Sequence, residues 1–203
     1  MQSVRFDGAT LPAGWLWVDP DAGFSPTPHE FKDAVITITI PTAKDLYGQN
    51  RTAPRLVKPI EGDFQIETHV KFDPKMDYQG AGLLIYKDED NYIRLERSFG
   101  GVGGEGSGIR LDLRKGGEYT SLATPVDIPT SLTEVDLKLI RRLNVFSAFW
   151  RSDEDGEWRL IEDVSTDYGD TVLAGVIGCN TAEPIKAVFS NIRLMPQPVT
   201  RPY

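Results

Sequence analysis

Strict alternation of apolar and polar residues over 64–72 is the feature that most constrains how this chain can fold. Phe64, Ile66, Thr68, Val70 and Phe72 alternate with Gln65, Glu67, His69 and Lys71. Successive side chains of a strand point to opposite faces of a sheet, so this period of two predicts a strand with one buried face and one polar face. A helix would need a period near 3.6, and no segment keeps such a period over several turns.

The same strand pattern recurs along the chain, with turn signals roughly every ten residues. Strands are expected over 34–40, 81–86, 92–97, 109–114, 135–140, 145–150, 158–161, 171–178 and 187–194. Many short strands separated by turns are typical of a sandwich or barrel. Because 203 residues suit one such unit better than two, we predict a single all-β sandwich domain of two antiparallel sheets over 1–203, with an extended tail at 195–203.

The acidic balance of charge narrows the classes of partner. The chain has 30 acidic and 22 basic residues, for a net charge of −8. Such a chain repels both the phosphate backbone of nucleic acids and anionic membrane surfaces, so we expect neither as a partner. No run approaches the length of a membrane span, and the N-terminus lacks an apolar signal core. The chain as written is therefore expected in the cytoplasm, and its oligomeric state is left open.

The supply of cysteine and histidine limits the chemistry further. Cys179 is the one cysteine, so no intrachain disulfide can form. It lies in the apolar run Val176-Ile-Gly-Cys179, which favours a buried, inert thiol over a nucleophile. With only two histidines the chain offers too few ligands for a zinc site. We expect no cofactor.

Polar residues on the expected outer faces of several strands form the candidate binding site. They are Arg55, Glu67, His69, Tyr86, Arg94, Glu96, Arg110 and Asp112. We predict that these residues lie on neighbouring strands and line one groove. Arginine and carboxylate groups hold sugar hydroxyls through paired hydrogen bonds, and the ring of Tyr86 can stack on a sugar. The alternative is a solvated sheet face with weak cross-strand ion pairs.

Short motifs occur in order through most of the chain. They are Phe6-Asp-Gly, Trp15-Leu-Trp17, Asp45-Leu-Tyr47, Ala53-Pro-Arg-Leu56, Gly62-Asp-Phe64, Tyr78-Gln-Gly-Ala-Gly-Leu83, Asp90-Asn-Tyr-Ile-Arg94-Leu-Glu-Arg97 and Phe189-Ser-Asn-Ile-Arg-Leu194. Together they resemble the concanavalin A-like lectin/glucanase superfamily, in the form found alone in bacterial proteins and at the C-terminus of family-43 glycoside hydrolases. The resemblance implies a jelly-roll sandwich with one concave and one convex sheet.

The resemblance also implies a function, namely a carbohydrate-binding or accessory module that uses the concave sheet. It allows a structural Ca²⁺, for which Asp7 and Asn191 are candidate ligands. The superfamily's glucanases carry the strand motif Glu-x-Asp-x-x-Glu, which is absent here, and this argues against ordinary glycoside hydrolysis. Two alternatives stay open: a sugar-active enzyme with Glu67 or Glu96 as base, and a protein-interaction domain.

Overall fold

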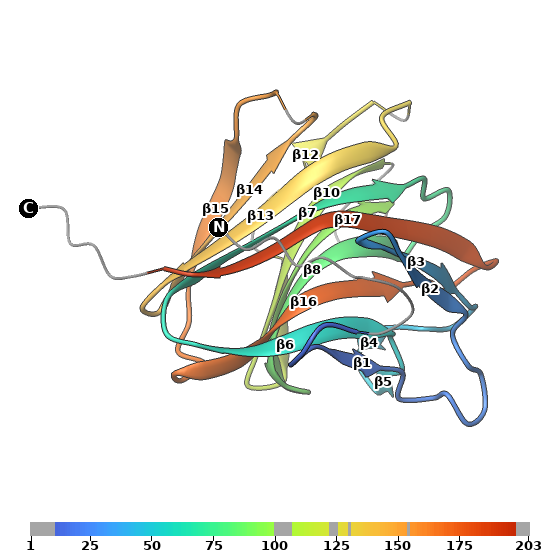
Figure 1. Cartoon of the computed structure of the whole chain (residues 1–203), viewed down its shortest axis with the longest axis horizontal. Coiled ribbons are helices and arrows are strands. Elements are labelled where there is room, and N and C mark those ends of the chain that lie inside the picture. Colours follow the sequence, from blue (N-terminus) through green and yellow to red (C-terminus); the bar gives the residue numbers. More distant parts are fainter. Residues whose placement is uncertain (1–10, 100–106, 122–125, 130, 154, 198–203) are drawn as a thin grey trace, which may run out of the picture.

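The computed structural model describes residues 11–99, 107–121, 126–129, 131–153 and 155–197 (Figure 1). In these residues the regular structure is all strand, and no helix could span a membrane. The strands are β1 (Leu16–Val18), β2 (His29–Lys32), β3 (Val35–Ile40), β4 (Leu46–Tyr47), β5 (Asn50–Arg51), β6 (Arg55–Glu61), β7 (Phe64–Phe72), β8 (Gln79–Asp88), β9 (Asn91–Phe99), β10 (Ser107–Lys115), β11 (Glu118–Ser121), β12 (Val126–Asp127), β13 (Glu134–Arg142), β14 (Val145–Arg151), β15 (Arg159–Ser165), β16 (Thr171–Cys179) and β17 (Ile185–Pro196).

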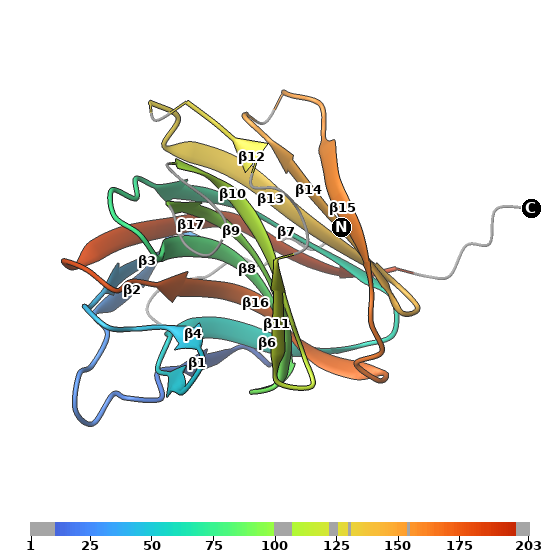
Figure 2. The same cartoon turned by 180° about the vertical axis from the view of Figure 1, so that it is seen from behind.

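Two large antiparallel sheets form the layers of a sandwich. The eight-stranded sheet has the order β1-β6-β16-β8-β9-β10-β11, with β12 paired to β10. The seven-stranded sheet has the order β15-β14-β13-β7-β17-β3-β2. Figures 1 and 2 show these layers from opposite sides. The predicted all-β sandwich is confirmed.

Alternation located the strands closely. Each strand predicted from the pattern is present, and β7 has the predicted bounds. The predicted tail begins inside a strand, because Met195 and Pro196 pair with Gln65 and Phe64 as part of β17. Residues 198–203 of that tail lie outside the described part of the chain.

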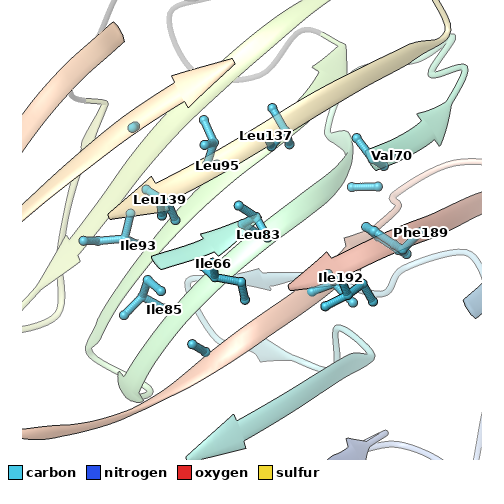
Figure 3. Packing of buried hydrophobic residues seen from close by; sticks show 14 of the residues in the cluster. Ile66, Val70, Leu83, Ile85, Ile93, Leu95, Leu137, Leu139, Phe189 and Ile192 are labelled. Atoms are coloured by element: carbon cyan, nitrogen blue, oxygen red, sulfur yellow. The ribbon is translucent and has the colours of Figure 1, made fainter. Parts of the chain in front are cut away.

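The main core lies between the two sheets. Figure 3 shows Ile66 of β7 near Leu83 and Ile85 of β8, while Val70 of β7 lies toward Phe189 of β17, and all five side chains are fully buried. Along β7 the buried positions are the ones that the period of two assigned to the apolar face. Burial of this size supplies the main favourable free energy of folding.

A second apolar cluster lies on the outer face of the eight-stranded sheet, the face turned away from its partner sheet. It gathers Leu84 of β8, Tyr92 of β9 and Ile177 of β16 under Leu46 of β4. The hydroxyl of Tyr92 donates a hydrogen bond to the carbonyl oxygen of Leu46 over 2.7 Å. This contact holds the β4–β5 hairpin on the outer face of the sheet, and it places Asp45 and Tyr47, which flank Leu46, on that face as well.

The last two strands of the described residues, β16 and β17, occupy interior places in their sheets. Strand β16 lies between β6 and β8 in one sheet, and β17 lies between β7 and β3 in the other. Figures 1 and 2 show both as long ribbons that run through the middle of their sheets. Neither sheet is continuous without its C-terminal strand.

Candidate functional site

A pocket opens on the outer face of the eight-stranded sheet, beside the β4–β5 hairpin. The space in it that water-sized molecules can occupy is about 50 Å³, and all the empty space in and above it, open solvent included, is about 450 Å³. We call it the sheet pocket. Its lining residues are Asp45, Tyr47, Tyr78, Gln79, Gly80, Arg94, Glu96, Ser98, Phe99, Arg110, Asp112, Tyr119 and Cys179.

Alternating charges on β9 and β10 form the floor of the sheet pocket. Antiparallel pairing places Arg94 opposite Asp112 and Glu96 opposite Arg110. All four side chains are buried, although each carries an ionisable group. Buried ionisable groups are costly unless they are paired, so such a floor is uncommon on a sheet that serves only as scaffold.

Arg94 connects the acidic groups of the floor. Its Nη1 lies 3.4 Å from Oδ1 of Asp45, and its Nη2 lies 3.3 Å from Oδ2 of Asp112. Its Nη1 is also 3.9 Å from Oε1 of Glu96 and 3.3 Å from the Sγ of Cys179. Burial alone would lower the pKa of Arg94, but the acidic groups around it hold the pKa well above its usual value. Arg94 therefore stays charged.

Glu96 is held differently from the two aspartates. Its side chain is almost fully buried, and its Oε1 has no hydrogen-bond partner among the described residues. Burial raises the pKa of Glu96, and the nearby Arg94 only partly offsets that effect. A Cβ at Gly80 would lie 2.9 Å from Oε2 of Glu96, so glycine leaves the room that this carboxyl needs.

Three tyrosines stand around the sheet pocket. Tyr47 and Tyr78 are 42% and 53% exposed, and the rings of Tyr47 and Tyr119 meet edge to face at 5.3 Å. The hydroxyl of Tyr119 donates a 2.6 Å hydrogen bond to Oδ1 of Asp112. Tyr78 has a φ of 65°, in the left-handed region that non-glycine residues seldom adopt. Such backbone strain is concentrated at functional sites.

Four of the eight residues selected from the sequence line this pocket. They are Arg94, Glu96, Arg110 and Asp112. Arg55 and Tyr86 lie on the same sheet but outside the lining. The guanidinium of Arg55 lies 4.9 Å from the centre of the Tyr86 ring and donates a hydrogen bond to the carbonyl oxygen of Ala53. The ring of Tyr86 therefore stacks with Arg55, and Tyr86 is not an aromatic residue of the sheet pocket.

The expectation that Glu67 and His69 share a groove with the other residues is wrong. Both lie on β7, which belongs to the seven-stranded sheet and pairs with β13 and β17. His69 pairs there with Asp136, and Oε1 of Glu67 lies 3.3 Å from Nη1 of Arg193. Alternation along a strand defines a polar face but does not say to which sheet the strand belongs.

His69 gives the protein a pH-dependent contribution to stability. Its Nδ1 lies 2.7 Å from Oδ1 of Asp136, and this hydrogen bond is the largest cause that raises the pKa of His69 above its usual 6.5. Protonated His69 therefore stabilises the fold below that pH, and the contribution is lost as the pH rises through the folded-state pKa. We expect His69→Gln to reduce the free energy of unfolding by about 1 kcal/mol near pH 5.5 and by less near pH 9. Urea unfolding at both pH values measures this, and an equal loss at both would contradict the assignment.

The sequence reasoning missed most of the pocket's other polar and aromatic lining. Asp45 and Tyr47 belong to one of the short motifs, and Tyr78 to another, but the strand pattern did not assign a chemical role to any of them. Tyr119 lies on the short strand β11, which the pattern did not predict. Cys179 is 2% exposed, so its expected burial is confirmed, and burial raises the pKa of its thiol well above the usual value.

A metal site finds no support in the described ranges. Within them no group of three or more histidine, cysteine, aspartate or glutamate side chains is placed to hold an ion. Asn191, one candidate Ca²⁺ ligand, has a φ of 51° where β17 shifts its register against β7. Asp7, the other candidate, lies outside the described residues. A structural Ca²⁺ therefore stays a prediction.

Known proteins share the fold of this chain at low sequence identity. The family model described as "Protein of unknown function (DUF1349)" matches residues 24–101, which is less than half of the chain. No curated protein matches the chain in sequence.

A functionally unknown protein from Saccharomyces cerevisiae aligns over 92% of this chain and 98% of its own, with 16% identity and a TM-score of 0.75. The GH43 protein BlXynB from Bacillus licheniformis aligns over 95% of this chain with 15% identity and a TM-score of 0.76, and this chain spans only 39% of it. The carbohydrate-binding module CBM66 from Bacillus subtilis aligns over 90% of this chain and 95% of its own, with 14% identity and a TM-score of 0.54.

The architecture and these structural neighbours define the class: the chain is a concanavalin A-like jelly-roll sandwich. The fold predicted from the motifs is confirmed. Proteins that bind carbohydrates are among its structural neighbours. At these identities the comparison establishes the fold, and function must be argued from the site.

Proposed function

We propose that the chain binds a carbohydrate in the sheet pocket. The observation that carries the proposal is one pocket with a buried arginine–carboxylate floor and exposed tyrosine rings at its rim. Sugars present hydroxyl groups at their edge and an apolar ring face. The floor supplies fixed donors and acceptors for the hydroxyls, and the rim supplies aromatic surface for the ring.

The rigidity of the floor favours binding over simple solvation. Arg94 is held by Asp45 and Asp112, and Asp112 also accepts the hydrogen bond from Tyr119. Groups that are already oriented lose little conformational entropy when a ligand arrives. An exposed sheet face with mobile lysines would lack this order.

The structural neighbours support the same reading. One is a carbohydrate-binding module of nearly the same length, and another is a GH43 protein of which this chain spans 39%. The support for a catalytic role is weaker, because burial raises the pKa of Glu96 and so disfavours the ionised form that a general base needs. Glu67, the other candidate base, lies on the opposite sheet.

A thermal-shift screen against neutral mono- and oligosaccharides tests the proposal. A sugar that binds only the folded state stabilises it by about 2.7 kcal/mol at a hundred times its dissociation constant. We expect Tyr47→Ala and Tyr78→Ala each to weaken binding by about tenfold, which is about 1.4 kcal/mol, because each removes ring surface at the rim. Calorimetric titration of the best sugar measures the change.

Phe24→Ala is the matched control, since Phe24 is 91% exposed and lies outside the pocket lining. It should leave affinity unchanged. Equal losses in all three variants would mean that the sugar does not bind at the sheet pocket. A broad panel without any stabilising sugar would refute the proposed function.

A further inference from the structure

The charges that line the sheet pocket point to one class of sugar, an inference that rests on the proposed function. Besides Glu96, the lining holds two arginines, Arg94 and Arg110, and two aspartates, Asp45 and Asp112. These two pairs balance. The charge that a ligand meets is therefore decided by the fifth group, Glu96.

The neighbours of Glu96 leave one oxygen of its carboxyl, Oε1, without a hydrogen-bond partner among the described residues. Both terminal nitrogens of Arg94 lie nearer to other acids, with Nη1 at 3.4 Å from Asp45 and Nη2 at 3.3 Å from Asp112. The distance from Nη1 to Oε1 of Glu96 is 3.9 Å, which is too long for a hydrogen bond. A buried carboxylate oxygen without a hydrogen bond disfavours the ionised form and so favours the protonated carboxyl.

The groups packed around Glu96 agree with this assignment. On β9 and β10, Arg94 and Arg110 favour its ionised form, whereas Asp112 opposes it. Asp45, from the segment before β4, opposes ionisation as well. Cys179 on β16 is a buried thiol whose own pKa is raised, and on β8 the glycine Gly80 faces Oε2 of Glu96. Burial is the largest of these effects, and it raises the pKa of Glu96.

We propose that the sheet pocket selects uncharged sugars, and that Glu96 binds a sugar hydroxyl as a neutral carboxyl that donates a hydrogen bond. A neutral carboxyl can both donate and accept, which matches a hydroxyl group. With Glu96 neutral, the lining carries no net charge. A uronic acid or an amino sugar would bring in a charge with no free counter-charge, and its desolvation would be uncompensated.

Titration of binding against pH, with a Glu96→Gln variant, tests the proposal. The probes are neutral D-glucose, D-galactose and D-xylose and their oligosaccharides, compared with D-glucuronate, D-galacturonate and D-glucosamine. For the wild type we expect affinity for the best neutral probe to fall at least tenfold as the pH rises and Glu96 loses its proton. Glu96→Gln, which keeps a donor and an acceptor, should bind within about threefold of the low-pH wild type and show no such fall.

The charged probes should bind at least tenfold more weakly than their neutral counterparts. Glu162→Gln on β15 is the matched control and should keep the wild-type pH profile, because Glu162 lies on the other sheet. Preference for a charged probe, or a wild-type affinity independent of pH, would overturn this inference while leaving sugar binding intact. Absence of binding for every probe at every pH would overturn the proposed function and this inference together.

Folding of the variant is checked without any sugar. A raised carboxyl pKa means that the folded state loses stability as pH rises from the unfolded-state pKa toward the folded one. Urea unfolding should therefore show Glu96→Gln gaining stability relative to the wild type at higher pH. A Glu96→Gln variant that loses the same stability at every pH would show that Glu96 is not held neutral, and the inference would fail.

Discussion

Replacing Lys44 by methionine is expected to lower the free energy of unfolding by about 3–5 kcal/mol. The Nζ of Lys44 lies 3.3 Å from Oδ1 of Asp19 and 3.5 Å from Oδ2 of Asp21. The side chains of Lys44 and Asp19 are 1% and 5% exposed, so methionine would leave the Asp19 carboxylate buried without its cation. Urea unfolding of the two proteins measures the difference.

The effect should reach the sheet pocket too. The backbone of Lys44 pairs with Asn180 in both directions, and Asp45 of the pocket follows directly in the chain. We therefore expect Lys44→Met to weaken sugar binding as well. Lys71→Met is the control, because Lys71 and Glu134 are 60% and 44% exposed and such pairs contribute about 1 kcal/mol or less. Comparable losses in the two variants would show that the burial of the Lys44 pair does not matter.

Arg94→Met is expected to abolish sugar binding and to lower the free energy of unfolding by about 3–5 kcal/mol. The substitution removes the cation shared by Asp45 and Asp112, and the Asp112 side chain is nearly fully buried. At low pH the stranded carboxylates take up protons, so the loss of stability should be smaller there. Unfolding measured near pH 4.5 and pH 8, together with calorimetric titration of the sugar, tests both parts.

Arg94→Lys separates charge from geometry at this position. Lysine keeps the positive charge but cannot contact Asp45 and Asp112 through a planar fork. We expect it to recover most of the stability and little of the binding. Full binding by Arg94→Met, with the protein folded, would remove Arg94 from the proposed site.

The fold was predictable because strand alternation is a local property. β7 shows the period of two within nine residues, and no distant contact is needed to recognise it. The short strands β4, β5, β11 and β12 escaped prediction for the complementary reason. They contain two to four residues each, which is too short for alternation to be recognised, and only their pairing with neighbouring strands defines them.

The site was predictable only where neighbours in space are also neighbours in sequence. β9 and β10 follow one another and pair directly, so alternation placed Arg94, Glu96, Arg110 and Asp112 together. β7 precedes β8 in the chain, yet the two strands belong to different sheets, which explains why His69 was misplaced. Asp45 joins the pocket from a distant segment, and a single sequence holds no record of such a contact. Tyr119 is near in sequence, but β11 is too short for alternation to reveal it.

The interior places of β16 and β17 determine when this protein can fold during its synthesis. Until residues 171–196 have left the ribosome, β6 and β8 have no strand to join them, and neither do β7 and β3. A nascent chain of that kind presents unpaired strand edges in both layers, which are templates for aggregation. Folding must therefore wait until β16 and β17 have been made, and the pairing of strands so far apart in sequence makes it intrinsically slow.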